Sequence, residues 1–362
     1  MRSSGEFRNW ALLCAICITA LALSQNDGKE RRSLKATTPK ATTVPMLEPH
    51  RGRLANKPTE IPARGWKDIF WRIYNESSDD RILAVAAGMT FYALLALFPG
   101  IAAFVSLYSL LGDPGALAAK IESSLFLLPT GAGDIVLGEI RRAAANSTSL
   151  LSLKALFTLA LAIYGANAAM KATFDGLNVA YEEREKRTFL ALNVQSLCFT
   201  VLGLAFLLSA NFLMIGVPII LKQVYLGSGT ETVIALARWP VASVLMFMVL
   251  AALYRYGPSR TEPKWRWVTV GSAAAVILWI AVSAAFSWYV SAFAGYDRTY
   301  GSLGTLIALM TWIWLSATTV LLGAEINAEM EHQTVRDTTI SPEKPLGLRG
   351  ARMADTIGKA AS

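Results

Sequence analysis

An uncharged apolar segment near the carboxyl end of the chain places the strongest constraint on its fold. Residues 303–322 carry no charged side chain, and the surrounding segment 299–331 reads TYGSLGTLIALMTWIWLSATTVLLGAEINAEME. At a rise of about 1.5 Å per residue, a helix of about 20 residues crosses a hydrocarbon core of about 30 Å. Similar segments recur along the chain. We therefore expect an all-α, polytopic membrane protein.

Composition supports this class and weighs against a nucleic-acid-binding protein. Hydrophobic residues make up 54% of the chain and charged residues 17%, and the net charge is +8. A basic chain can bind nucleic acid, but here Lys and Arg cluster at the ends of the apolar segments, as in membrane proteins that follow the positive-inside rule. We expect membrane lipid as a partner and no nucleic acid. The sequence carries no signal for an oligomeric state.

The sequence predicts no metal centre, no cofactor and no catalytic residue. Both histidines, His50 and His332, lie outside the apolar segments. Cys14 and Cys17 form a CxxC pair, but inside an apolar run without the βαβ context of a redox motif.

Six segments are long and apolar enough to be transmembrane helices, and short amphipathic helices are expected beside the first of them. The six are residues 82–111, 150–177, 189–221, 233–254, 267–294 and 303–322. Residues 66–74 (WKDIFWRIY) alternate aromatic and basic side chains and suit a helix in the membrane interface. The connection 112–149 predicts two short amphipathic helices or a partly re-entrant hairpin. Pro99 and Gly100 predict a kink, and a gating point, in the first span.

The chain divides into an amino-terminal extension (1–65), a membrane domain (66–331) and a cytoplasmic tail (332–362). Residues 10–24 resemble the apolar region of a signal peptide or a weak anchor, although the basic residues after them resist export. Alternatively, translation begins at Met46. Residues 33–62 predict a disordered linker. The distribution of Lys and Arg places both termini in the cytoplasm.

Two polar helix faces are the candidate binding site. Asn167, Lys171 and Asp175 recur at intervals of four on the second span, and Asn178 continues the face. On the sixth span the small or polar residues recur at intervals of seven and lie near one helix face. They are Gly304, Thr311, Thr318 and Glu325.

We expect these faces to meet, with Lys171 and Glu325 at similar depth, and to line a pocket for a head group or a coupling ion. A charge inside the bilayer is costly and usually faces the protein interior. The alternative is structural: Lys171 and Asp175 pair with each other at the helix end, and Glu325 is a solvated end-of-span residue.

Three stretches together resemble one family. They are MTFYALLALFPGIAAFVSLYSLLGDP (89–114), LYRYGPSRTEPKWRWVTVGSAAAVILW (253–279) and YGSLGTLIALMTWIWLSATTVLLGAEINAE (300–329). These stretches, with the Gly-Leu-Asn-x-Ala-Tyr around Asn178 and Tyr181, are similar to the YihY/BrkB family of bacterial inner-membrane proteins, once labelled ribonuclease BN. The resemblance covers about residues 66–331. It implies a six-helix protein of the bacterial inner membrane, for which transport or flipping of lipid-like molecules is the usual expectation.

We predict a secondary transporter or translocator of an amphiphilic, lipid-like substrate rather than an enzyme. The chain has no Walker motif, and its carboxylates are scattered at span ends rather than clustered as metal-dependent nucleases require. A structural or scaffolding membrane protein is the alternative. A ribonuclease is a third, disfavoured one.

Overall fold

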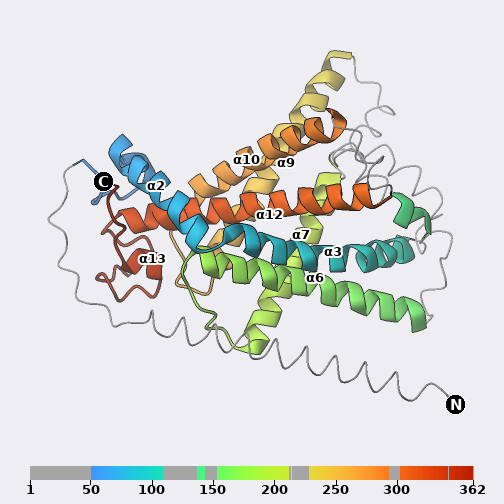
Figure 1. Ribbon diagram of the computed structural model, residues 1–362, viewed down its shortest axis with the longest axis horizontal. Helices are drawn as coiled ribbons and strands as arrows, with labels where there is room; N and C mark the ends of the chain where they lie inside the picture. Colours follow the sequence, from blue (N-terminus) through green and yellow to red (C-terminus); the bar gives the residue numbers. More distant parts are fainter. Residues whose placement is uncertain are drawn as a thin grey trace. The chain divides into compact units, whose positions relative to one another are not determined.

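Every regular element that the structure describes is helical, as predicted. The computed structural model describes residues 50–108, 137–142, 153–211, 213, 228–292, 302–340 and 342–361. The elements are η1 (Pro58–Glu60), α2 (Ala63–Asp79), α3 (Ile82–Tyr108), α6 (Leu153–Ala180), α7 (Phe189–Asn211), α9 (Ser228–Tyr256), α10 (Trp265–Ala292), α12 (Ser302–Gln333) and α13 (Arg352–Asp355) (Figure 1). Residues 137–142 are also helical.

Five of the described helices are long and apolar enough to cross a membrane. They are Ile82–Ala102 in α3, Phe189–Phe206 in α7, Leu236–Tyr256 in α9, Trp265–Ala292 in α10 and Leu306–Gln333 in α12. Large apolar side chains cover the outer surfaces of these helices, a pattern that water does not tolerate and lipid does. The chain is therefore an integral membrane protein with several spans. The predicted second span, α6, is not among the five.

Helices α3, α6 and α12 form the centre of the described fold. Figure 1 shows α3 and α6 running side by side, and these two make the most extensive helix contact. Phe174 and Leu177 on α6 are buried in one apolar core with Leu321 on α12. At Gly165 the α6 backbone comes so close to α3 that an added Cβ would lie 2.9 Å from the Cα of Ala96. Small residues permit this close approach of helices within a membrane.

Pro99 and Gly100, where a kink is expected, lie within one continuous helix. Pro99 lies inside α3, which continues to Tyr108. A Cβ added at Gly100 would meet no atom within 4 Å, so this side of α3 faces away from its neighbours. A gating role for the pair stays a prediction.

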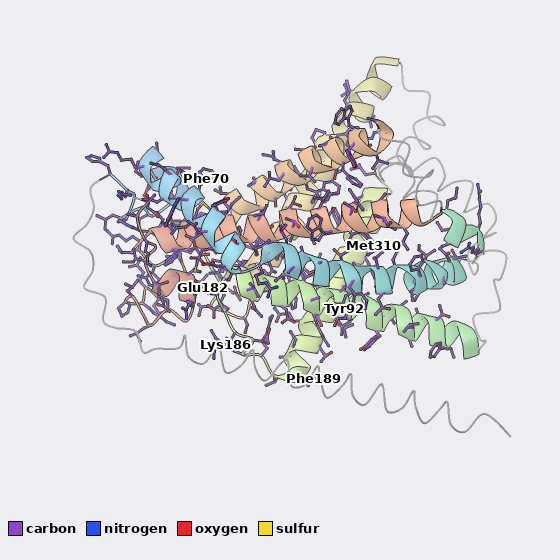
Figure 2. All side chains as sticks on the ribbon, viewed as in Figure 1. Phe70, Tyr92, Glu182, Lys186, Phe189 and Met310 are labelled. Atoms are coloured by element: carbon purple, nitrogen blue, oxygen red, sulfur yellow. The ribbon has the colours of Figure 1, made fainter. Side chains whose placement is uncertain are left out.

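Helix α2 is longer than the predicted segment 66–74. One face is buried through Asp68, Ile69 and Arg72, and the helix packs against α12. The opposite face exposes large aromatic side chains, among them Tyr74 and Phe70, which is labelled in Figure 2. The helix therefore has one protein-facing and one outward, aromatic side.

Residues 50–62 are folded, so the prediction of a disordered linker over 33–62 is wrong for this part. Ala55 and Ile61 are buried with Ile69, Trp267 and Met330 in a second apolar core. The few apolar side chains of this segment pack against α2, α10 and α12. Local composition does not reveal such contacts, because the partners are far away in the chain. The predicted apolar run 10–24, the rest of the linker, and the connection 112–149 apart from 137–142 lie outside the described residues.

The carboxyl-terminal segment folds back on the helices rather than extending as a free tail. Among its residues Thr338, Thr339, Met353 and Ala354 are buried. The backbone N–H of Ala361 donates a 2.9 Å hydrogen bond to Asp68 of α2. We call the region formed by residues 50–79, 181–188, 257–264 and 325–361 the polar end of the molecule.

Candidate functional site

A charged side chain of α6 contacts an amide on the apolar helix α7. The ammonium of Lys171 donates a 2.6 Å hydrogen bond to Oδ1 of Asn193. Asn193 lies one turn into the candidate span of α7, and its own amide donates a 2.7 Å hydrogen bond to the carbonyl oxygen of Phe189. This second bond turns Oδ1 of Asn193 toward Lys171.

Two further side chains complete this group. The hydroxyl of Ser196, which is fully buried, donates a 2.5 Å hydrogen bond to Oδ1 of Asn167, and the amide of Asn167 reaches Oδ1 of Asn193 at 3.4 Å. We call Asn167, Lys171, Asn193 and Ser196 the α6–α7 polar cluster. Hydrogen bonds of this kind hold membrane helices together, since lipid offers polar groups no alternative partner.

The Lys171 ammonium has only neutral partners within the described part of the chain. Besides Asn193 it contacts the ring of Phe189, 5.7 Å from the ring centroid. No ion pair joins it to Asp175, which is exposed one helical turn away. The alternative interpretation, an Lys171–Asp175 pair at the helix end, is thus not the arrangement found.

Asn178 belongs to the polar end rather than to this cluster. Its amide donates to Glu185 at 3.1 Å, and its Oδ1 accepts the backbone N–H of Ser259 at 2.7 Å. Burial raises the pKa of Glu185, but hydrogen bonds from Arg187 outweigh this and lower that pKa to about 2. Asn178 therefore ties the end of α6 to the two loops that follow α6 and α9.

Glu325 does not meet Lys171, contrary to the expected pocket between α6 and α12. It is 1% exposed, and its Oε1 has no hydrogen-bond partner among the described residues. The charged groups that act on it most strongly are all acidic: Asp80, Glu329, Glu76 and Glu182. Because α6 turns Phe174, Gly176 and Leu177 toward the core, its polar side faces α7 instead.

The rest of the α12 stripe is satisfied within its own helix. The hydroxyls of Thr311 and Thr318 each donate a 2.8 Å hydrogen bond to the carbonyl one turn earlier, of Ile307 and Trp314. Gly304 is buried. The structure therefore brings Asn167 and Lys171 together with α7 and leaves Asp175, Asn178, Thr311, Thr318 and Glu325 outside that group. Pro99 and Gly100 on α3 belong to no polar group.

Sequence reasoning missed Asn193 and Ser196. A signal for them existed, because polar residues inside an otherwise apolar span are rare and are usually kept for function. Asn193, Gln195 and Ser196 stand close together in the first third of the third predicted span.

Sequence reasoning also missed the buried ion pairs of the polar end. The guanidinium of Arg260 makes two hydrogen bonds, 2.8 and 2.9 Å long, to the carboxylate of Glu331, and both side chains are nearly inaccessible. Arg72 of α2 pairs with Glu329 and donates at 2.8 Å to Gln333. Paired guanidinium and carboxylate groups of this geometry fix the elements that carry them.

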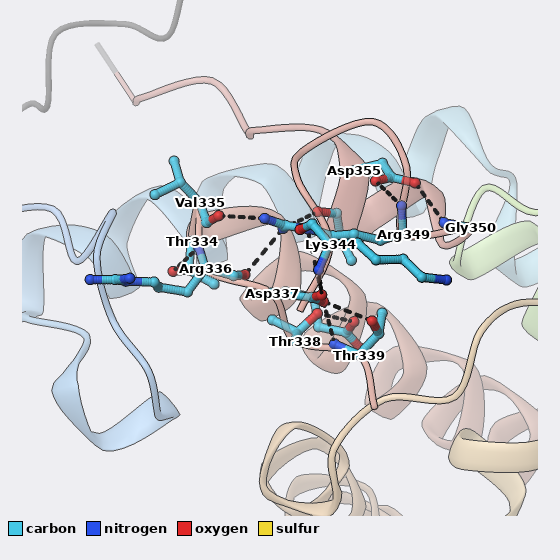
Figure 3. Close-up of polar contacts among 12 residues, drawn as sticks. Thr334, Val335, Arg336, Asp337, Thr338, Thr339, Lys344, Arg349, Gly350 and Asp355 are labelled. Atoms are coloured by element: carbon cyan, nitrogen blue, oxygen red, sulfur yellow. Dashed lines mark hydrogen bonds and ion pairs between the residues drawn. The ribbon is translucent and has the colours of Figure 1, made fainter. Parts of the chain in front are cut away.

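Arg349 and Asp355 organise the carboxyl-terminal segment (Figure 3). The guanidinium of Arg349 donates to the carbonyl oxygens of Val335 and Ala354, both at 2.6 Å. The carboxylate of Asp355 accepts the backbone N–H groups of Gly347, Arg349 and Gly350. Burial lowers the pKa of Arg349, and the nearby Asp337 carboxylate opposes this effect.

The described residues contain no group of three or more His, Cys, Asp or Glu side chains placed to hold a metal ion.

Comparison with known proteins connects this fold to a family. A sequence profile described as "Virulence factor BrkB" matches residues 73–346. A Bacillus subtilis (strain 168) protein named as ribonuclease-like protein YfkH is 35% identical over 180 residues, which are 48% of this chain and 64% of YfkH. The matched part thus spans a little less than two thirds of that relative.

Two further relatives match over most of their length. A UPF0761 membrane protein of Pseudoalteromonas translucida (strain TAC 125) is 26% identical over 76% of this chain and 88% of its own. A UPF0761 membrane protein of Haemophilus influenzae (strain 86-028NP) is 22% identical over 73% of this chain and 94% of its own length. No solved structure matches. With the profile covering most of the chain, the protein belongs to the virulence factor BrkB family of membrane proteins.

Proposed function

We propose that the protein is a translocator of an amphiphilic, lipid-like molecule in the bacterial inner membrane. The observation that carries the proposal is the half-buried Lys171 ammonium, which contacts a membrane-spanning helix and has only neutral partners among the described residues. Ionisable residues within membrane spans are rare, because a charge in hydrocarbon is costly, and they usually mark a substrate or ion pathway.

The proposal counts α6, the second segment in chain order, as a membrane span in addition to the five candidates. Its 28 residues extend about 42 Å at 1.5 Å per residue, enough to cross a bilayer. Because α6 packs along α3 over a long distance, we propose that both helices cross the membrane side by side. Residues 66–331 then form the membrane domain.

The proposed topology places the polar end, and with it both termini, in the cytoplasm. Basic residues are concentrated in the loops and segments of this end, as the positive-inside rule requires. The aromatic outer face of α2 suits the membrane interface beside it. Residues 332–362 then cap the cytoplasmic side.

A scaffolding membrane protein is the second candidate, and the buried ion pairs Arg72–Glu329 and Arg260–Glu331 favour it. Such pairs rigidify one end of the molecule and need no substrate. A scaffold does not require a charge at Lys171, so substitution of this residue separates the two candidates. A ribonuclease, the activity in the name of YfkH, is the least favoured, since nothing at the polar cluster would activate a water molecule.

The test is lipid translocation by the full chain in proteoliposomes. Fluorescent phosphatidylethanolamine and phosphatidylglycerol are added separately, and the fraction that dithionite quenches is followed over time. We expect movement of at least one lipid that is faster than in protein-free vesicles. In Lys171→Met it slows by about tenfold, the effect of losing one charge-assisted hydrogen bond.

The matched control is Thr173→Ala on the same helix, whose hydroxyl donates a 2.9 Å hydrogen bond to the carbonyl oxygen of Ala169 in that helix. It is expected to translocate like the wild type. Rates equal to those of protein-free vesicles for both lipids would contradict the proposal, and equal rates in wild type and Lys171→Met would favour the scaffold.

A further inference from the structure

We infer that Lys171 and Asp175 bind the phosphoethanolamine head group of a zwitterionic phospholipid, with phosphate at Lys171 and amine at Asp175. The inference names the substrate class of the translocator and therefore rests on the proposed function. Both side chains lie on one face of α6, and neither pairs with the other.

The first step of the argument is the unsatisfied charge of Lys171. An ammonium has three N–H donors, and Asn193 accepts only one of them. Arg72 and Arg260, two buried cations of the polar end, differ because each pairs with a carboxylate. Lys171 thus keeps donors and a full positive charge for an anionic group.

The second step is the preorganisation of the site. Asn193 is held by the carbonyl of Phe189, and Asn167 is held by the buried hydroxyl of Ser196. The Asn167 amide reaches Asn193 only at 3.4 Å, a long hydrogen bond that an oxygen of a bound lipid can replace. Polar groups fixed in this way bind without first losing conformational freedom.

The third step is the order of the residues along α6. Lys171 lies nine residues before Ala180, about 14 Å from the helix end at 1.5 Å per residue, and Asp175 lies about 6 Å nearer to that end. In a phospholipid of the adjacent leaflet the phosphate lies deeper than the amine. Toward the helix end, the positive and then the negative residue therefore follow each other in the same order as the phosphate and the amine.

The fourth step is access from the lipid. Large apolar side chains next to the cluster are exposed on both helices, including Tyr164 on α6 and Leu190 and Val194 on α7. Figure 2 shows Phe189 at the outer edge of the helices. Acyl chains can lie along these residues while the head group reaches the cluster, so the lipid need not leave the bilayer to bind.

The fifth step is the charge of the head group. The carboxylate of Asp175 is exposed and forms no ion pair among the described residues. It would repel the second charge of a phosphomonoester. The glycerol of phosphatidylglycerol offers it hydroxyl donors but no positive charge, and bonds from neutral donors are the weaker ones. A primary amine donates hydrogen bonds to it, whereas the trimethylated amine of phosphatidylcholine cannot.

The experiment measures lipid association rather than transport. The full chain is reconstituted in phosphatidylcholine, and spin-labelled phosphatidylethanolamine or phosphatidylglycerol is added. The immobilised fraction then gives relative affinities. We expect the wild type to prefer phosphatidylethanolamine over both other lipids by about tenfold, the value of one charge-assisted contact. Asp175→Asn should abolish the preference over phosphatidylglycerol, and Lys171→Met should weaken binding of both labelled lipids.

Lys171→Arg keeps the charge and should retain binding, so it controls for a Lys171→Met variant that fails to fold. Thr173→Ala should behave like the wild type. A wild type without preference for phosphatidylethanolamine, or a preference that Asp175→Asn leaves intact, overturns the inference. Selective binding without any translocation would instead refute the proposed function and leave the site standing.

Discussion

Lys171 on α6 donates its 2.6 Å hydrogen bond to the neutral amide of Asn193 on α7, not to a carboxylate. The pair places a positive charge against a helix that is otherwise apolar, and the two residues have different roles. Asn193 supplies one acceptor and sets the position of the ammonium. No carboxylate in the described part of the chain pairs with this charge.

Replacing Asn193 by aspartate tests this division directly. Asn193→Asp would give Lys171 an ion-pair partner, so we expect thermal stability in detergent to stay at or above that of the wild type. Lipid translocation should nevertheless fall by about tenfold, because the protein now neutralises the charge itself. Val201→Ala, at an exposed site on the same helix and outside the proposed lipid site, is the control. An Asn193→Asp variant with normal translocation would show that the charge of Lys171 is not used.

The contact between α10 and α12 should tolerate no added methyl group at Gly323. A Cβ there would lie 2.7 Å from the Cβ of Ala275 and 2.8 Å from the carbonyl oxygen of Gly271. We expect Gly323→Ala to destabilise the fold by about 1–3 kcal/mol, the usual cost of overpacking. Gly203→Ala on α7 is the control, since a Cβ there meets no atom within 4 Å. Thermal unfolding in one detergent compares the two, and equal melting temperatures would contradict the packing seen here.

Glu185 should make the stability of the polar end depend on pH in the acid range. Its pKa of about 2 lies below the ordinary value of 4.5, because hydrogen bonds from Arg187 outweigh the effect of burial. A lowered pKa contributes stability that is complete above about pH 4.5 and is lost as the pH falls toward 2. The melting temperature of the wild type should exceed that of Glu185→Gln at pH 7, and the difference should vanish near pH 2. A difference that persists there would rule out this linkage.

Cysteine labelling should locate the polar end. In a variant without Cys14, Cys17 and Cys198, a cysteine at the exposed Lys186 should react only after the inner membrane is permeabilised. A cysteine at Asn146, in the predicted connection after the first span, should react in intact spheroplasts. The reverse pattern would invert the proposed topology.

Purified protein should cleave RNA no faster with divalent metal than the double variant Glu325→Ala, Asp175→Ala. Neither carboxylate lies in a group of three metal-ligating side chains within the described chain. Metal-dependent cleavage that disappears in the double variant would restore the ribonuclease hypothesis.

The sequence by itself determined the class of this protein. Uncharged apolar segments of membrane-crossing length leave the backbone no option but helices, since lipid offers no partner for its polar groups. The three motifs in 89–114, 253–279 and 300–329 were sufficient to indicate the family, and helical spacing correctly put Asn167 and Lys171 on one face of α6.

Only the tertiary structure decided where that face points. Periodicity gives the angle between residues on one helix but not the rotation of the helix against its neighbours. Here the close approach at Gly165 and the burial of Phe174 and Leu177 rotate α6, so that Lys171 meets Asn193 instead of Glu325. The folding of residues 50–62 and of the carboxyl-terminal segment could not be predicted from local sequence either. Ala361 bonds to Asp68, which is far away in the chain. Arg349 bonds to the carbonyl oxygen of Val335, a backbone group that every residue possesses.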